Sequence, residues 1–479
     1  MGIGDWADDL LDGLERARRG VDELFEPTLR LGVTGLSGAG KTVFITALVA
    51  SLLKRGRMRM LSAQASGRLE TVDLRPQPDP DVPRFAFEAH VKALTATQPV
   101  WPDSTRSVSQ LRLSLRYRPS GFFSGLTGPS TLHLDIVDYP GEWLLDLTLL
   151  DQDYEAWAAQ ALALAESPAR AEYAGPWREA LAGADPTAPH DEPMAETLHH
   201  AYRNYLNACR LAGHSALAPG RFLMPGELEG TPALTFAPLP KPARAGRRSL
   251  YAQMRDRFDA YKKVVAKPFF RDHFARLDRQ VVLIDALGAL ARGPRAMSDL
   301  TATMAETLSA FRHGSNSWLD QILGTRRIDR LLFVASKADH LHHAQHPALS
   351  ALVEAMLAEA ARRAEWDGAE TRAMAIAAIR ATSEQETTRD GRELQLVRGV
   401  RLDTGREAAI FPGELPGDPR ALLAAADASA PGEAPEDWPE DSFAALAFAP
   451  PGWGSDPGDG PPHIRLDSAL EFLIGDRLE

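Results

Sequence analysis

The residues with the clearest chemical pattern form the stretch GLSGAGKT, from Gly35 to Thr42. Its spacing, G-x-x-x-x-G-K-[ST], is typical of loops that bind the phosphates of a nucleotide. Glycines let such a loop turn so that several backbone N–H groups point into one concavity, and the N-terminus of a following helix adds positive potential. Lys41 should reach the β- and γ-phosphates, and the Thr42 hydroxyl should bind Mg²⁺. The residues predicted to contact the nucleotide here are Gly35, Ser37, Gly38, Ala39, Gly40, Lys41, Thr42 and Val43.

A second pattern, Asp138-Tyr139-Pro140-Gly141, follows the alternating apolar stretch 131–137, which predicts a strand. At the end of such a strand, Asp138 is expected to hold Mg²⁺ through water. The Gly141 N–H is expected to contact the γ-phosphate, because glycine lets the backbone approach closely. D-x-x-G alone is a weak pattern, but its place after the phosphate loop and a predicted hairpin strengthens the interpretation.

A third pattern, Ser336-Lys337-Ala338-Asp339, follows the apolar strand predicted at 329–335. GTPases carry [NT]-K-x-D at this place. The Asp339 carboxylate can accept hydrogen bonds from the guanine N1–H and amine, donors that adenine lacks at these positions. The stem of Lys337 should lie along the base. Ser336 replaces Asn or Thr, which leaves an ATP-using P-loop enzyme as an alternative.

Two further residues are expected to act on the γ-phosphate. Thr105 lies in a polar loop before the strand predicted at 109–118, where it would ligate Mg²⁺; Ser104 is a competitor, and a threonine that only caps a turn is the plain alternative. Glu142 stands where many GTPases have glutamine. An ionised glutamate cannot donate a hydrogen bond and would repel the γ-phosphate, so it should point away or accept a bond only from water. We therefore expect slow intrinsic hydrolysis.

The base site should be completed after the last apolar strand, predicted at 373–380, where a backbone N–H of Ala381 or Thr382 would suit guanine O6. The residues predicted to take part in hydrolysis are Lys41, Thr105, Gly141 and Glu142. The residues predicted to bind the metal are Thr42, Thr105 and Asp138.

The elements that must position these residues alternate between strands and helices. A strand before Gly35, a helix at 43–53, a hairpin at 109–137 and apolar strands near 279–287 and 329–335 predict a Ras-like α/β core, with a mostly parallel sheet and helices on both faces. The predicted division is an N-terminal amphipathic helix (1–27), a first core part (28–142), a mainly helical insertion (143–278), a second core part (279–390), and a C-terminal hairpin, Pro/Gly-rich segment and closing helix (391–479).

The composition of the chain argues against several classes of protein. The 479 residues carry a net charge of −12, which disfavours nucleic acid as a partner. Cys209 is the only cysteine, no apolar run is long enough for a transmembrane helix, and no secretory signal is seen, so a cytoplasmic protein is expected. The four histidines His340, His342, His343 and His346 are expected to form a solvated loop or helix start rather than a metal site.

The chain resembles the bacterial YcjX-like family. The resemblance rests on the phosphate loop, on Trp101-Pro102, on DYPGEW at 138–143 and on ALEFLIGD at 469–476, and it extends over nearly the whole chain. It implies a stress-associated P-loop GTPase with GDP and GTP states, a helical insertion, and a protein effector that includes an inner-membrane protein as partner. A peripheral position at the inner membrane through that partner is also implied.

The leading hypothesis is a GTP-binding and GTP-hydrolysing switch. The alternatives are an ATP-using P-loop enzyme and a nucleotide-gated scaffold in which hydrolysis is incidental.

Overall fold

The computed structural model describes residues 26–103, 107–120, 128–309, 328–366, 368–389, 391–429, 438, 447–453 and 459–479. Thr105, with its neighbours Ser104 and Arg106, lies outside the described residues, as does most of the predicted N-terminal helix. Within the described ranges, every helix is too short or too polar to cross a membrane.

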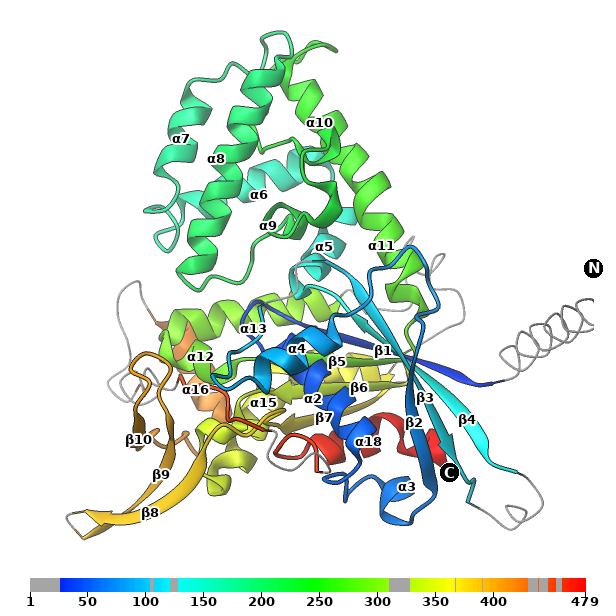
Figure 1. Cartoon of the computed structure of the whole chain (residues 1–479). Helices are drawn as coiled ribbons and strands as arrows, with labels where there is room; N and C mark the ends of the chain where they lie inside the picture. Colours follow the sequence, from blue (N-terminus) through cyan, green and yellow to red (C-terminus); the bar gives the residue numbers. More distant parts are fainter. Residues whose placement is uncertain are drawn as a thin grey trace, which may run out of the picture.

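A seven-stranded sheet in the order β2-β3-β4-β1-β5-β6-β7 forms the centre of the molecule (Figure 1). β1 lies in the middle and pairs in parallel with β4 and β5, and the parallel pairing continues through β6 to β7. β3 is antiparallel to β4 and β2 is antiparallel to β3. The prediction of a mostly parallel Ras-like sheet is confirmed. The strands are β1 (Thr28–Gly35), β2 (Leu69–Arg75), β3 (Ser109–Tyr117), β4 (Ser130–Asp138), β5 (Arg279–Ile284), β6 (Arg330–Ala335) and β7 (Glu370–Ala375).

Helices cover both faces because the apolar residues of the central strands alternate in direction. In β5, Val281 and Leu283 join one core, whereas Val282 and Ile284 join another. The first core contains α2 (Lys41–Lys54), α4 (Phe87–Leu94) and α18 (Leu466–Ile474). The second contains α12 (Ala286–Ala291), α13 (Pro294–Ser309), α15 (His346–Trp366) and α16 (Pro419–Ala428).

The chain between β4 and β5 is helical and packs around its own aromatic core. Figure 1 shows α6 to α10 as a unit apart from the sheet, joined to it near α5 and α11. The sequence of residues 147–165 predicts one helix, but the structure has two, because the Asp153 carboxylate accepts the Ala156 N–H at 2.8 Å and starts a new helix. The elements are η1 (Gly141–Leu145), α5 (Asp146–Leu150), α6 (Tyr154–Glu166), α7 (Gly175–Ala182), α8 (Glu192–Leu211), α9 (Gly220–Leu223), η2 (Gly226–Leu228), η3 (Pro232–Leu234), α10 (Leu250–Tyr261), η4 (Lys262–Ala266), α11 (Lys267–Asp272) and η5 (Phe274–Arg276).

Several local predictions are wrong. The sequence after Gly56 predicts an irregular segment, but this segment contains α3 (Ser62–Ala65) and the edge strand β2. The apolar pattern of β2 is weak because much of the strand is exposed. β7 ends at Ala375 rather than near residue 380, and the chain then leaves the sheet. A separate three-stranded sheet follows, in which β9 (Arg392–Val400) pairs with both β8 (Ser383–Arg389) and β10 (Glu407–Ile410).

The C-terminal helix α18 is built into the sheet. The Arg279 guanidinium, fully buried, lies 2.9 Å from Asp329 and 2.6 Å from Asp476, just after α18. At the start of α18, the Asp467 carboxylate accepts the Met60 N–H at 3.0 Å. These contacts, 197 and 407 residues apart in sequence, make α18 part of the core rather than an appended tail.

Candidate functional site

The phosphate loop joins β1 to α2, as the sequence predicts. Gly38 and Gly40 have φ values of 85° and 87°, a left-handed conformation that glycine adopts without strain and other residues adopt rarely. Lys41 is buried and its Nζ donates to the Gly35 carbonyl at 2.8 Å. Because an ammonium has three donors, two remain for phosphate oxygens. The loop thus has the form of an anion-binding turn.

The end of β4 lies directly against this loop. Asp138 is paired with Val33 of β1, two residues before Gly35, and its side chain is buried. A Cβ on Gly141 would lie 2.6 Å from the carbonyl carbon of Gly35, so only glycine fits there. Thr42 Oγ1 donates to the carbonyl of Asp103 at 3.2 Å, immediately before residues 104–106. The threonine and the aspartate therefore follow adjacent strands of one sheet edge and provide the hydroxyl and carboxylate oxygens that Mg²⁺ prefers.

Glu142 does not point away from the phosphate loop. Its Oε1 accepts the backbone N–H of Ser37 at 2.8 Å, and the side chain is only 3% exposed. Among the described residues, Oε2 is buried without a hydrogen-bond partner. The sequence-based expectation that Glu142 turns away or bonds only water is wrong, because the tight approach of Gly141 to Gly35 carries the next side chain onto the loop.

The residues predicted to contact the base, 336–339, follow β6 and are called the base-reading segment here. Ser336 Oγ donates to the Ile284 carbonyl at 3.2 Å, and Lys337 Nζ lies 2.6 Å from Asp285 Oδ2. Burial alone would raise the pKa of the Asp285 carboxyl, but the Lys337 ammonium lowers it below its usual value, so the pair is ionic. Asp339 Oδ2 accepts the Ala381 N–H at 2.8 Å, which fixes the carboxylate.

A cavity of about 310 Å³ connects the phosphate loop with the base-reading segment. Lys41, Thr42, Lys337 and Asp339 all line it. After β7, residues 376–379 line the cavity wall. Ala381 and Thr382 instead hydrogen-bond to Asp339: the Ala381 N–H donates to its carboxylate, and the Thr382 hydroxyl donates to its backbone carbonyl.

Three aromatic or apolar residues of this cavity escape sequence analysis. Trp101 precedes β3, and Leu402 lies between β9 and β10. Phe448 comes later in the chain and pairs with Arg401 in an isolated antiparallel bridge. Trp101 Nε1 donates to the Phe448 carbonyl at 2.7 Å, so two distant parts of the chain form one wall of the cavity. The Trp101-Pro102 pair, noted only as a family feature, is the single sequence clue to this wall.

The histidine group after Asp339 is not simply solvated. His342 and His346 are buried, contrary to expectation. His346 Nε2 lies 2.8 Å from the Ala338 carbonyl, which holds the base-reading turn against α15. His340 lines the cavity, and its ring lies edge-on to Phe448 with 5.3 Å between centroids.

The residues after Gly141 are enclosed by the helical unit. Trp143 Nε1 donates to the Met224 carbonyl at 3.0 Å, and the Arg221 guanidinium lies 3.1 Å from the Trp143 ring centroid. A Cβ on Gly220 would lie 1.8 Å from the Glu142 carbonyl oxygen. Residues 142–143 therefore cannot move without disturbing residues 220–224.

Asp146 extends this contact. Its carboxylate accepts the Gly220 N–H at 2.7 Å and the hydroxyl of Tyr261. Burial raises the pKa of Asp146 to about 6, although these bonds and the charge of Arg221 oppose the shift. Burial also lowers the pKa of the Arg221 guanidinium to about 10.

The sheet order, the phosphate loop and the cavity at the carboxyl ends of the strands define an α/β P-loop protein with a Ras-like core. The chain belongs to the YcjX-like family, whose family model matches residues 29–478. One relative, named Ras-like GTPase YcjX from Escherichia coli (strain K12), is 39% identical over 472 residues, covering 96% of this chain and 97% of the relative. Another of the same name, from Shewanella oneidensis, is 38% identical over 477 residues, covering 94% and 95%.

Proposed function

We propose that this chain is a Mg²⁺-dependent GTP-binding and GTP-hydrolysing switch with slow intrinsic turnover. The observation that carries the proposal is the meeting of Lys41, Thr42 and Asp339 around one cavity, with Asp138 and Gly141 against the same loop. The names of the relatives point to the same activity.

Each end of the nucleotide has a matching group. The loop N–H groups and Lys41 would bind the phosphates, and Asp339, held by Ala381, would pair with guanine. The backbone of residues 376–379 lines the cavity and is the better candidate for guanine O6 than Ala381 or Thr382. Thr42 and Asp138, with Thr105, would hold Mg²⁺, which supplies neutralisation of phosphate charge when bound.

Glu142 gives a reason for slow turnover and for switching. Its carboxylate uses the Ser37 N–H, a donor that the phosphate loop offers to anions, and its charge repels a γ-phosphate. A triphosphate must therefore displace Glu142. Because Gly220 lies against the Glu142 carbonyl, and Met224 and Arg221 contact Trp143, that displacement reaches the helical unit.

We infer that residues 143–278 act as an insertion that reports the nucleotide state to a protein effector. The wider setting rests on the family resemblance alone: a bacterial stress response, a cytoplasmic chain, and an inner-membrane protein as partner. In this scheme hydrolysis resets the switch.

The decisive experiment is calorimetric titration of the purified chain with GDP, a non-hydrolysable GTP analogue and ADP, each with Mg²⁺. Guanine nucleotides should bind at least tenfold more tightly than ADP. Lys41→Ala should abolish binding, whereas Lys54→Ala, at the exposed end of α2, should not. Equal affinity for ADP and GDP, or binding retained by Lys41→Ala, would refute the proposal.

Transmission to the insertion has its own test. Hydrogen exchange of residues 220–224 should differ between the GDP and GTP-analogue complexes, whereas α7, which is remote from Glu142, should not change. Identical exchange at 220–224 in both complexes would contradict the transmission step.

A further inference from the structure

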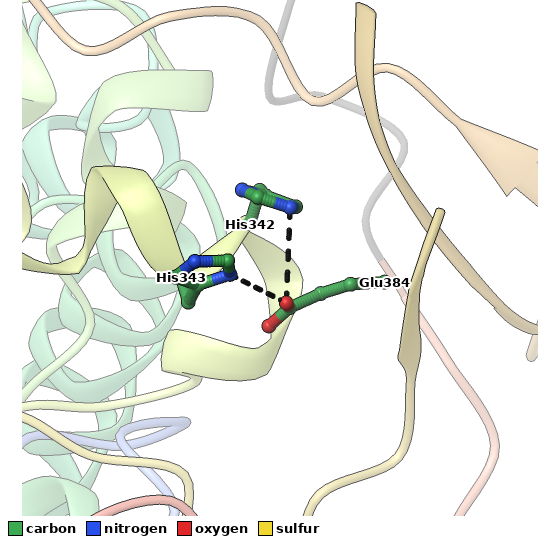
Figure 2. A group of neighbouring side chains, drawn as sticks. All are labelled: His342, His343 and Glu384. Carbon is green, nitrogen blue, oxygen red and sulfur yellow. Dashed lines mark hydrogen bonds and ion pairs between the residues drawn. The ribbon is translucent and has the colours of Figure 1, made fainter. Parts of the chain in front are cut away.

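A second group of side chains with metal-binding chemistry lies beside the base-reading segment (Figure 2). His342 and His343 come from the turn before α15, and Glu384 comes from β8. His343 Nδ1 lies 2.7 Å from Glu384 Oε2, and His342 Nε2 lies 3.7 Å from the same oxygen. Glu386 brings a second carboxylate, with Oε1 at 3.6 Å from His342 Nε2.

We propose that His342, His343 and Glu384 form a binding site for one divalent transition-metal ion, with Zn²⁺ as the best match. Imidazole nitrogens and carboxylate oxygens bind Zn²⁺ at about 2.0–2.2 Å. Two ligands of the same ion therefore stand roughly 3.0–3.5 Å apart. The three ligand atoms already lie within 4.8 Å of one another, so side-chain shifts of about an ångström would place them around one ion.

Simple histidine–glutamate ion pairing explains the group less well. His342 is 3% exposed, yet its Nε2 lies beyond hydrogen-bond distance from both carboxylates. Arg380 pairs with the other oxygen of Glu384, Oε1, at 3.3 Å. That contact turns Oε2 toward the two rings, as the outer partners of metal ligands commonly do.

Metal binding makes one structural demand. His342 Nδ1 accepts the Ala344 N–H at 3.4 Å, which requires a lone pair on Nδ1. An ion on Nε2 moves the ring proton to Nδ1, so this long contact must open. The first turn of η7 (His343–Gln345) is the part of the chain that has to adjust.

The position of the site gives it a consequence for the nucleotide. His342 is three residues after Asp339, and Glu384 is three residues after Ala381, whose N–H fixes the Asp339 carboxylate. An ion here would tie these two segments together and stiffen the base contact. This consequence, unlike the metal site itself, rests on the proposed function.

The test uses the full chain without a polyhistidine tag, stripped with a chelator and titrated with Zn²⁺ in excess Mg²⁺. We expect one bound equivalent by calorimetry and by elemental analysis after dialysis. His343→Ala and Glu384→Gln should each weaken binding at least tenfold, whereas His190→Ala, an exposed histidine of the insertion, should leave it unchanged. His343 is 66% exposed, so its loss should not unfold the protein, and thermal melting checks this.

Absence of stoichiometric Zn²⁺ binding, or equal binding by His343→Ala and the unchanged chain, would overturn the site. Co²⁺ in place of Zn²⁺ should give a visible spectrum that the two variants lose, and a spectrum retained by both would also overturn it. GDP affinity should rise severalfold with Zn²⁺; equal affinity with and without bound Zn²⁺ would overturn the link to the base. A chain that takes up Zn²⁺ but never binds GDP would refute the proposed function and leave the metal site standing.

Discussion

The Glu142 side chain occupies a hydrogen-bond donor of the phosphate loop that it contacts. It presents a carboxylate to the same Ser37 N–H that an anion would use, and it is almost completely buried. Lys41, in contrast, keeps two donors available beyond its bond to Gly35. At the residue scale, the Glu142 carboxylate is therefore an internal anion that would compete with a bound phosphate for the Ser37 N–H.

Glu142→Ala removes the internal anion and its repulsion of a γ-phosphate. We expect affinity for the GTP analogue to rise relative to GDP, by about tenfold if the repulsion is worth roughly 1.4 kcal/mol. Paired calorimetric titrations measure the ratio. Glu354→Ala, at an exposed position on α15, is the control, and an unchanged ratio in Glu142→Ala would contradict the competition.

Asp339→Asn tests the base. An amide cannot accept both guanine donors, whereas its N–H can pair with the carbonyl that xanthine carries in place of the amine. GDP affinity should fall at least about tenfold, since a hydrogen bond to a charged group is worth about 1.5–3 kcal/mol, and xanthosine diphosphate should gain. Competition binding measures this, with Asp259→Asn in the insertion as control. Retained guanine preference would mean that another residue reads the base.

The sequence alone was sufficient to predict the positions of Lys41, Asp138 and Asp339 in the fold, because each belongs to a short local pattern at or just after the end of a strand. Their roles toward a nucleotide stay predictions. It was not sufficient for Trp101 and Phe448, which meet through a hydrogen bond across 347 residues. No local pattern encodes such a contact. The direction of Glu142 also depended on how closely two glycines approach, which only packing decides.

Among the elements, η1 and α5 connect the nucleotide site to the helical unit. Asp146, the first residue of α5, is bonded to Gly220 at the start of α9 and to Tyr261 at the end of α10. Its environment raises its pKa to about 6. Folding therefore favours the protonated form of Asp146, and the hydrogen bonds from Tyr261 and Gly220 stabilise the ionised form.

Asp146 makes stability pH-dependent with a defined sign. Its pKa is raised on folding from 3.8 to about 6, so its stabilising contribution is fully present below pH 4 and is lost as pH rises through 6. Relative to Asp146→Asn, the free energy of unfolding of the unchanged chain should fall by roughly 2 kcal/mol between pH 4 and pH 7. Denaturant titrations measure this. The control is Asp73→Asn, an exposed position on β2, whose free energy of unfolding should depend on pH as it does in the unchanged chain. The same pH dependence in Asp146→Asn and the unchanged chain would refute the expectation.

Element boundaries were predictable where a strand or helix was strongly apolar, as in β5 and α2. They were not predictable where a cap or an exposed edge decided them. Asp153 splits one predicted helix. Asp418 starts α16 within the predicted Pro/Gly-rich segment, and the exposed β2 is held as a strand by its pairing with β3.

On the scale of the whole molecule, the proposed nucleotide cavity is assembled from several distant parts of the chain. The phosphate loop, the segment around Trp101, the segments after β6 and β7, and residues near Leu402 and Phe448 all line it. The late sheet β8–β10 thus contributes to the same cavity as the first strand. Ligand binding should therefore stabilise the molecule as a unit.

Phe448→Ala should weaken GDP and the GTP analogue equally, by about tenfold, because an aromatic wall against a base is commonly worth 1 kcal/mol or more. The hydrogen bond that Trp101 Nε1 donates to the backbone carbonyl of residue 448 does not involve the Phe448 ring, so this substitution leaves its acceptor in place. Phe411→Ala, which removes an exposed phenylalanine outside the cavity, is the control. A changed GDP-to-GTP ratio, or unchanged affinity, would contradict the role of Phe448.

The position of α18 determines when, during synthesis of the chain, the first core can be completed. A nascent chain that has reached residue 465 already contains the phosphate loop, Asp138, Asp339 and Phe448. It lacks the helix that covers one face of the sheet and supplies Asp467 to Met60, as well as Asp476, which pairs with Arg279. Until α18 emerges from the ribosome, that apolar face stays exposed and Arg279 lacks one of its carboxylates. The completed core therefore forms only after residues 466–476 have been translated, and until then the uncovered sheet face is an apolar surface of the kind that chaperones bind.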